Sequence, residues 1–123
     1  APPRIKNVSP AARKTTSYTE MKAIEKIPKW ATSPEQNNHR IIRAYFQLLS
    51  ESGRVNRPAL ETRCQNEVDH PDVYVRDFKG NFASMKTDKG NSHGKVFEDD
   101  GYNIKIWTKV SDTLEAYKSM FLK

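Results

Sequence analysis

The 123-residue sequence contains only one cysteine and no long apolar run, and these two absences limit what the chain can be. One cysteine, Cys64, cannot form an intramolecular disulfide, which excludes the disulfide-stabilised class of small secreted domains. No stretch approaches the ~20 apolar residues that a membrane helix needs, and the N-terminus has no apolar signal core. We therefore expect a protein of a reducing compartment, cytoplasmic or nuclear, with no membrane partner.

Arrangements typical of metal sites and nucleophiles are also missing. The three histidines and the cysteine show no metal-ligand spacing, so no metal site is expected. No serine, threonine or cysteine stands in a recognisable nucleophile context. Hydrophobic residues make up 36% and aromatic residues 10% of the chain, which is enough to pack the core of one domain. We expect a small folded domain without catalysis and without a cofactor.

The positive charge is concentrated at the N-terminus. The net charge is +6, and residues 1–32 hold seven lysines and arginines against two glutamates, so residues 33–123 carry only +1. Residues 1–16 mix proline, serine, threonine and cations, which is typical of a segment that does not order on its own. We expect residues 1–32 to form a flexible basic arm that contacts a polyanion, with Arg13 and Lys14 among the contacts. A solvated tail that keeps the protein soluble would have the same composition.

A short helix is predicted at the end of this arm. It covers residues 19–27, and Pro28 is expected to break it near its end. Three apolar residues share one face of it: Met21, Ile24 and Ile27. We expect this face and the following Trp30 to dock on the core.

The strongest helix signal begins at Ser33. A serine cap, Pro34 at the first helical position and Gln36 three residues after the cap form a capping box. Gly53 is a natural end for this helix. The predicted buried face consists of Ile41, Ile42, Tyr45, Phe46, Leu48 and Leu49. The predicted polar face consists of His39, Arg40, Arg43 and Gln47.

Asn56 is placed to cap the next helix, which is predicted to run to about Asn66. Val55 and Leu60 can form a hydrophobic staple around the cap, and Leu60 and Cys64 form the inner face. The residues up to Pro71 are expected to be a connection, because a proline disfavours helix in the residue before it.

Residues 72–87 allow two interpretations. In a helix capped by Asp72, one apolar stripe would consist of Tyr74, Phe78, Phe82 and Met85. In a hairpin, Gly80 and Asn81 would form the turn between two strands. The helix is favoured, because the residues before Gly80 do not alternate well between polar and apolar.

The last third of the chain changes to a two-residue period. Residues 95–98 predict a short strand, and residues 102–110 alternate as a second strand of the same hairpin. Trp107 falls on the polar side of that strand, and we expect Trp30 or another arm residue to cover it. Ser111 is expected to cap a final helix, whose buried stripe consists of Leu114, Tyr117 and Phe121.

From residue 33 the predicted order is helix, helix, helix, hairpin, helix, with a short extended segment before the second helix. This order resembles a winged helix-turn-helix domain over residues 33–123. The resemblance implies an α+β, mostly helical fold: a three-helix core, a β-hairpin wing and a C-terminal helix. It also implies that a recognition helix at about residues 72–87 enters the DNA major groove, while a wing at about 88–109 touches the backbone or minor groove. The expected function is double-stranded DNA binding, as in a phage or bacterial transcription regulator.

The residue types on the predicted recognition helix suit this function. Arginine reads guanine, asparagine reads adenine, and lysine or serine holds phosphate. The expected contacts on the helix are Arg76, Lys79, Asn81, Ser84 and Lys86. The expected contacts in the loop that follows are Lys89, Asn91, Ser92, His93 and Lys95, where two glycines let the backbone approach a phosphate. Arg57, at the start of the preceding helix, is also expected to bind nucleic acid. An ordinary solvated helix face carries similar residues.

A metal-dependent nuclease is one alternative. Pro71-Asp72 followed by Asp77-Phe78-Lys79 spells the PD…(D/E)xK string of a nuclease superfamily, in which acidic residues bind Mg²⁺ and the lysine assists the water. Those residues normally lie on neighbouring strands of a hairpin. The four residues between Asp72 and Asp77 are too few to turn a strand around, so this alternative is weaker.

A protein-interaction module is the other alternative. Winged-helix domains also serve in pairing, and an apolar patch of aromatic residues would support that use. The residues expected to line it are Trp30, Tyr102 and Trp107. A homodimer and a larger multidomain parent protein both stay open as assemblies.

Overall fold

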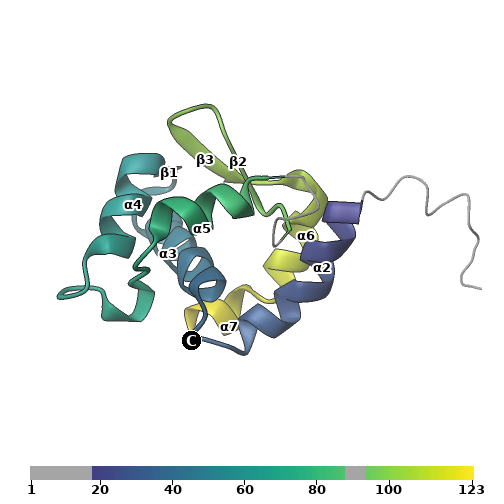
Figure 1. The fold of residues 1–123 in the computed structure, drawn as a ribbon, viewed down its shortest axis with the longest axis horizontal. Coiled ribbons are helices and arrows are strands. Elements are labelled where there is room, and N and C mark those ends of the chain that lie inside the picture. The colour runs from purple at the N-terminus through teal and green to yellow at the C-terminus, as the bar shows by residue number, and fades with distance from the viewer. Residues whose placement is uncertain (1–17, 88–93) are drawn as a thin grey trace, which may run out of the picture.

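The computed structural model describes residues 18–87 and 94–123, with side chains from residue 23 onward in the first helix. The predictions about the arm at residues 1–17 and about the loop at 88–93 lie outside these residues. The chain is α+β and mostly helical, with one small antiparallel sheet (Figure 1). The elements are α2 (Tyr18–Ala31), α3 (Asn37–Ser52), β1 (Val55–Asn56), α4 (Arg57–Gln65), the 3-10 turn η1 (Pro71–Val73), α5 (Phe78–Met85), β2 (Phe97–Asp99), β3 (Asn103–Ile106), α6 (Thr108–Ala116) and α7 (Lys118–Leu122). No helix in the described ranges is long and apolar enough to cross a membrane.

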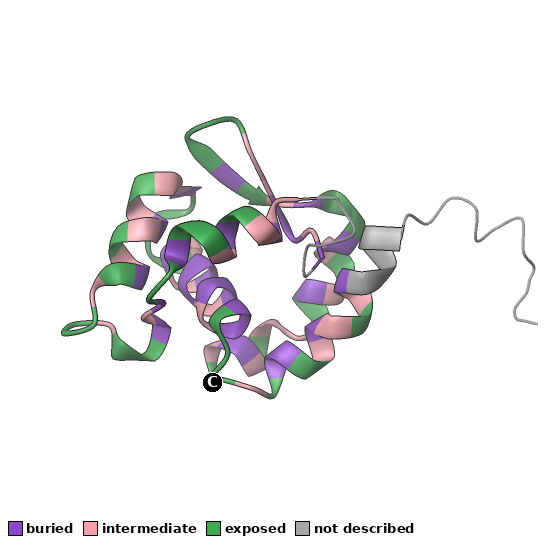
Figure 2. Cartoon of the chain, in the orientation of Figure 1, coloured by how far each residue is buried: buried purple, intermediate pink, exposed green. Residues whose placement is uncertain are grey.

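Helix α3 lies at the centre of the molecule. Helices α4 and α5 pack on one side of it, and α2, α6 and α7 gather on the other (Figure 1). Its buried residues therefore face more than one neighbour, and Figure 2 shows α3 buried along most of its length. The predicted apolar face is confirmed at Ile41, Ile42, Tyr45, Phe46 and Leu48, whereas Leu49 is half-buried.

His39 was predicted to lie on the polar face of α3, and this is wrong. It is only 2% exposed, its Nδ1 lies 2.7 Å from the carbonyl oxygen of Trp30, and its ring lies 5.1 Å from that of Phe121. Both α2 and α7 pack against α3, so α3 is buried on more than one face, and His39 lies on a face that these two helices cover.

The predicted start of α3 at Ser33 is also wrong. The helix begins at Asn37, and its N-cap Gln36 makes no capping hydrogen bond through its side chain. The backbone nitrogen of Ser33 donates instead to Trp30 O, at 3.0 Å. Ser33 therefore belongs to the turn that ends α2. The predicted end at Gly53 is confirmed, with φ +77° and a hydrogen bond from its nitrogen to Leu49 O.

Pro28 does not end α2, contrary to the prediction, since the helix continues through it to Ala31. An interior proline costs about 3 kcal/mol. Burying an Ile or a larger side chain contributes about 1.5–3 kcal/mol each, and Ile27 and Trp30 are 0% and 5% exposed. Ile27 precedes Pro28, so the burial of Trp30, with Ala31 at 4% exposed beside it, is what offsets the cost of carrying the helix past the proline. The predicted docking of Trp30 is confirmed.

The short strand β1 joins the first half of the chain to the hairpin. The sheet order is β1-β3-β2, and both pairs of neighbours are antiparallel. Val55 pairs with Ile104, and Phe97 pairs with Ile106. Asn56, the last residue of β1, caps α4 as predicted, because its Oδ1 accepts a hydrogen bond from Ala59 N at 2.9 Å.

The hairpin is confirmed, but its second strand is shorter than predicted. It ends at Ile106, and the helix α6 starts at Thr108, so Ser111 lies inside a helix instead of capping one. The spacing of Val110 and Leu114, both 0% exposed, follows the helical period and buries them in α6. Trp107 precedes α6 and is 7% exposed, instead of lying on the polar side of a strand.

Candidate nucleic-acid interface

The segment that had two interpretations contains a helix, α5, and no hairpin. Gly80 and Asn81 lie inside it, so the hairpin alternative is wrong. The helix is half as long as predicted, because residues 74–77 do not belong to it and Tyr74 is extended. The predicted cap Asp72 lies in η1, and the residue that caps α5 is Asp77, whose Oδ1 accepts a hydrogen bond from Gly80 N at 3.2 Å.

The glycine at position 80 has a local reason. A Cβ added there would collide with the Asp77 carboxylate that caps the helix. Glycine disfavours a helix interior by about 1 kcal/mol relative to alanine. At this position it leaves room for the cap, and the amide group of Asn81 adds a second local contact by donating to Asp77 O at 2.9 Å.

Three buried side chains anchor α5 to the core. Phe78, Phe82 and Met85 are at most 1% exposed. The rings of Phe78 and Phe82 stack, with centroids 5.2 Å apart and 12° between their planes. Phe82 also contacts Phe97 of β2, at 5.7 Å between centroids. The helix is therefore fixed to the hairpin as well as to its own neighbours, and its opposite side faces outward.

The outward side of α5 holds only part of the predicted contact set. Lys79 and Ala83 are exposed, whereas Asn81 and Ser84 are half-buried. Arg76 is exposed but precedes the helix. Within residues 18–87 and 94–123, neither Arg76 nor Lys79 forms an ion pair. Asp77 lies between these two cations in the sequence and is also exposed, so residues 76–79 carry a net charge of +1.

Two other predicted contacts are neutralised by the hairpin. Lys86 Nζ lies 2.8 Å from Asp99 Oδ2, and Lys95 Nζ lies 3.1 Å from Glu98 Oε2. The hydrogen bond from Lys86 lowers the pKa of Asp99, so the pair stays charged at neutral pH. Lys95 also lies over the Trp107 ring, 4.8 Å from its centroid. Both lysines thus hold β2 in place, and neither is freely available to a phosphate.

The turn of the hairpin is acidic. Asp100 Oδ1 accepts hydrogen bonds from the backbone nitrogens of Asn103, at 2.7 Å, and Tyr102, at 2.9 Å. These backbone hydrogen bonds lower the pKa of Asp100 and keep it ionised. Residues 95–107 hold two lysines against three acidic residues, a net charge of −1. The hairpin is therefore poorly suited to a polyanion.

Arg57 lies where α4, α5 and β3 meet. Its backbone nitrogen donates to Tyr102 O at 2.7 Å, and its guanidinium lies 5.4 Å from the centre of the Phe82 ring. Its Nε is 3.9 Å from Glu61 Oε1, and it is buried without a hydrogen-bond partner in the described part of the chain. The predicted contact at Arg57 is thus a half-buried cation that packs mainly on an aromatic ring.

Six of the predicted contacts fall outside the described residues. Arg13 and Lys14 belong to residues 1–17, and the others belong to residues 88–93. The latter are Lys89, Asn91, Ser92 and His93.

The nuclease-like string does not lie on two strands. Asp72 is in η1 and is held by Arg43 and Gln47, whereas Asp77 caps α5 and Lys79 follows in its first turn. Among the described residues no group of three or more His, Cys, Asp or Glu side chains could hold a metal ion.

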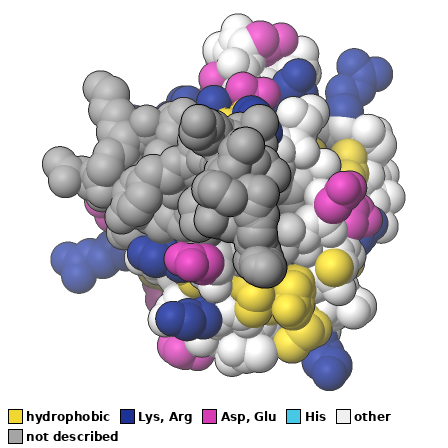
Figure 3. Space-filling view, turned by 90° about the vertical axis from the view of Figure 1, so that its right-hand side faces the viewer, with side chains coloured by type: hydrophobic (Ala, Val, Ile, Leu, Met, Phe, Trp, Pro, Cys, Tyr) yellow, Lys and Arg dark blue, Asp and Glu magenta, His cyan; other side chains and the backbone are white. Residues whose placement is uncertain are grey.

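The predicted aromatic patch is not formed. Of its three residues only Tyr102 is exposed, at 55%, whereas Trp30 and Trp107 are buried. Figure 3 shows the side of the molecule that lies at the right of Figure 1. Basic and acidic side chains are interspersed there, and no single-sign patch stands out among the described residues.

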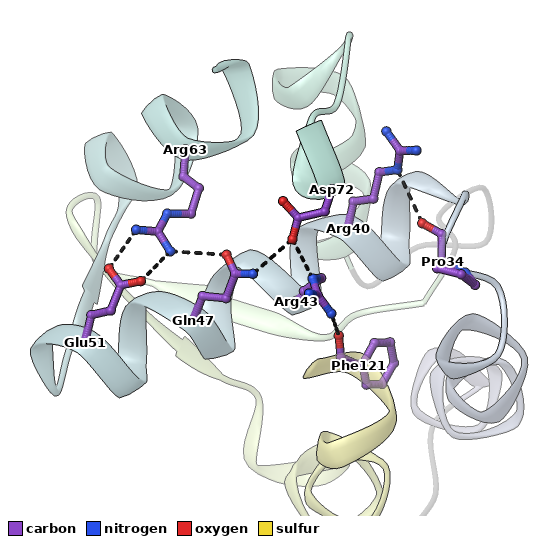
Figure 4. Close-up of polar contacts among 8 residues, drawn as sticks. All are labelled: Pro34, Arg40, Arg43, Gln47, Glu51, Arg63, Asp72 and Phe121. Atoms are coloured by element: carbon purple, nitrogen blue, oxygen red, sulfur yellow. Dashed lines mark hydrogen bonds and ion pairs between the residues drawn. The ribbon is translucent and has the colours of Figure 1, made fainter. Parts of the chain in front are cut away.

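A chain of polar contacts runs along α3 and fixes the connection that leads into α5. The sequence patterns did not predict these contacts. Arg63 of α4 forms a two-pronged contact with Glu51, at 2.7 and 2.8 Å, and also donates to Gln47. Gln47 and Arg43 both donate to Asp72 Oδ2, at 3.2 and 2.8 Å (Figure 4). Since Asp72 lies in η1, these contacts set where the chain leaves for Arg76 and α5. These polar residues come from α3, α4 and η1, and the local periodicity of a sequence cannot predict contacts between separate elements.

Comparison with known proteins adds no relative: no family model, curated protein or solved structure matches this chain.

Proposed function

We propose that this chain is a double-stranded DNA-binding module of winged-helix type, in which α5 and the residues before it contact the duplex. The element order α3–β1–α4–α5–β2–β3 supports this proposal, because it matches the order on which the resemblance rests. The pairing of β1 with β3 supports it too, since it joins the extended segment before α4 to the hairpin in one sheet. In this assignment α5 is the recognition helix and β2–β3 is the wing.

The observation that carries the proposal is the pair of exposed cations at the start of α5, which form no ion pair in the described part of the chain. Arg76 and Lys79 are exposed, and their helix is anchored by buried aromatic rings on its other side. An arginine can read guanine through two hydrogen bonds, and a lysine can hold a phosphate. The N-terminal end of α5 itself adds little to this attraction, because the Asp77 carboxylate already caps it. A duplex laid against this end of α5 would meet both cations.

The charges on the hairpin limit the role of the wing. Of its two lysines, Lys95 is engaged by Glu98 and Lys105 is exposed, and Asp100 at the turn is ionised. A phosphate next to Asp100 would be repelled. We therefore assign base and phosphate contact to α5 and its approach, and little affinity to the wing.

The test is a fluorescence-anisotropy titration of the full chain with a labelled duplex of mixed sequence. If binding occurs through phosphates, a plot of the logarithm of the association constant against the logarithm of the salt concentration should be a falling line. Its slope should be about −0.9 for each phosphate that the protein neutralises. Replacing both Arg76 and Lys79 by alanine should weaken binding by roughly 5- to 150-fold, the range of one good base contact. Lys109→Ala is the matched control, because Lys109 is an exposed lysine on α6.

Three results would contradict the proposal. Affinity independent of salt would exclude a phosphate-based interface. An equal loss in the Lys109→Ala variant would place the effect in overall charge, and an unchanged affinity in the double variant would exclude α5 as the contact.

A further inference from the structure

An open cavity of about 670 Å³ lies between the end of α2, the first half of α3, η1 and the end of α7. This size is within the range of small-molecule sites in proteins. The residues that line it include Pro34, His39, Arg40, Arg43, Asp72 and Met120. None of these residues belongs to the proposed DNA-contact set. The cavity therefore needs a separate explanation.

We infer that this cavity binds a small organic anion with an apolar body, such as an aromatic carboxylate, and that Arg40 and Arg43 hold its negative charge. The inference does not rest on the proposed DNA binding.

The two arginines are held in place and still have donors to offer. Arg40 uses Nε on Pro34 O, at 3.3 Å, and Nη1 on Tyr74 O, at 2.8 Å. Arg43 uses Nε on Asp72, at 2.8 Å, and Nη1 on Phe121 O, at 2.9 Å. Both side chains come from the first half of α3, and Figure 4 shows Arg40 reaching toward Pro34 and Arg43 reaching toward Asp72 and Phe121. Within the described residues, Nη2 of each arginine has no protein acceptor, and a guanidinium fixed in this way suits a carboxylate.

The charge of the lining is positive overall. Arg40, Arg43 and Lys123 contribute three positive charges, while Glu35 and Asp72 contribute two negative ones. Asp72 is already engaged by Arg43 and Gln47, which offsets its repulsion of an incoming anion. An anion is therefore favoured over a cation at this position.

His39 contributes a neutral, buried acceptor. Its Nδ1 must donate to Trp30 O, because a carbonyl oxygen only accepts. Burial lowers the pKa of His39, so the ring is neutral near pH 7 and Nε2 keeps its lone pair. A ligand with a hydroxyl group in addition to its carboxylate could donate to that nitrogen.

The remaining wall is apolar and explains why a simple inorganic anion is a poorer fit. Ala31, Pro34 and Met120 supply aliphatic surface to the cavity. Covering such surface with an aromatic ring is favourable by about 25 cal/mol per Å². The combination of two guanidinium groups with this wall selects an anion that carries an apolar body.

The test is a two-dimensional NMR titration of the full chain with benzoate, with benzyl alcohol as the neutral analogue and inorganic phosphate as the anion without an apolar body. Benzoate should give saturable shifts in the millimolar range at the Arg43 side-chain N–H, the His39 ring and the Met120 methyl group. It should bind at least fivefold more tightly than either of the other two probes.

Two variants and a control locate the site. Met120→Trp should abolish the benzoate shifts by filling the cavity. Arg43→Lys should weaken binding at least fivefold, because one ammonium group cannot keep the contacts to Asp72 and Phe121 O and also donate to the ligand. Arg54→Gln, an exposed arginine beyond the other end of α3, should change nothing. The spectrum of each free variant checks that it is folded, and Arg43→Lys decides the matter if Met120→Trp does not fold.

The inference is overturned if the shifts do not saturate or are scattered over all surface cations. Equal binding of benzyl alcohol would mean an apolar hollow, and equal binding of phosphate would mean non-specific charge. Unchanged benzoate binding in Arg43→Lys would equally exclude the assigned role of the arginines.

Discussion

Asp77 and Gly80 depend on each other, because the carboxylate that caps α5 occupies the space that a Cβ at position 80 would need. Gly80→Ala should therefore gain less stability than the helix propensity of alanine predicts, because the Asp77 carboxylate must move and give up the cap. In an Asp77→Ala background the same substitution should stabilise the protein, by up to about 1 kcal/mol. Urea unfolding of the two single variants and the double variant measures the coupling. A Gly80→Ala effect of equal size in both backgrounds would show that the two residues are independent.

A second glycine, Gly94, holds the chain before β2 close to α2. It has φ +116°, and a Cβ there would come within 2.8 Å of Ala23 N and 2.9 Å of Ala23 Cα. Gly94→Ala should thus cost more than the roughly 1–2 kcal/mol of a left-handed alanine, because backbone atoms must also move. Gly101→Ala is the matched control, since Gly101 has φ +98° with open space around it. Thermal unfolding should rank Gly94→Ala clearly below Gly101→Ala, and equal melting temperatures would refute the close packing.

The contact between Arg43 and Asp72 predicts a pH dependence of stability. Partial burial alone would raise the pKa of Asp72, but hydrogen bonds from Arg43 and Gln47 outweigh it, so the pKa is lowered. A carboxyl group with a lowered folded pKa stabilises the fold above its unfolded pKa of about 3.9, and this contribution is lost as the pH falls through the lower folded value. The Asp72 side chain is 45% exposed, so the contribution is roughly 0.5–1 kcal/mol.

Asp72→Asn checks this dependence directly. The variant should be less stable than the parent at pH 7, and the difference should shrink as the pH falls below 4. Urea unfolding at a series of pH values gives the comparison. A difference that stays constant with pH would show that the ionised carboxylate does not contribute.

Cys64 should be chemically silent in the folded protein. It is fully buried in the inner face of α4, and burial raises the pKa of its thiol to about 12. At pH 8 a thiol-specific reagent should therefore label it only when the chain opens, because the thiolate is the reactive form. The labelling rate should rise with urea in parallel with the unfolded fraction. Fast labelling without denaturant would contradict the burial of this residue.

Local sequence signals predicted the ends of those helices whose capping residue acts on residues close to it in the sequence. Gly53 ends α3 through its own backbone conformation, and Asn56 caps α4 through a contact three residues away. Pro28, Ser33 and Ser111 failed as signals because packing overrode them. The α2 helix passes through its proline to bury Trp30, and this extension occupies the backbone of Ser33 that was expected to start α3.

The candidate interface was predicted less well than the fold. The existence of α5 and its apolar anchors followed from the spacing of Phe78, Phe82 and Met85. The sequence did not predict the pairing of Lys86 with Asp99, because this contact depends on how the hairpin packs on α5. Charge along the sequence therefore overstated the number of cations that a nucleic acid could use.

The two-residue strand β1 has a consequence for how the chain folds. Its partner β3 follows α4, η1 and α5 in the sequence, so the β1–β3 contact closes a loop that contains most of the helices on one side of α3. Closing such a loop has an entropy cost that a pair of residues cannot offset alone. The hairpin β2–β3 can form locally, whereas β1 can join it only after α4 and α5 have packed. Protection of the β1 amides against hydrogen exchange should thus develop late in refolding, and it would report on completion of the domain.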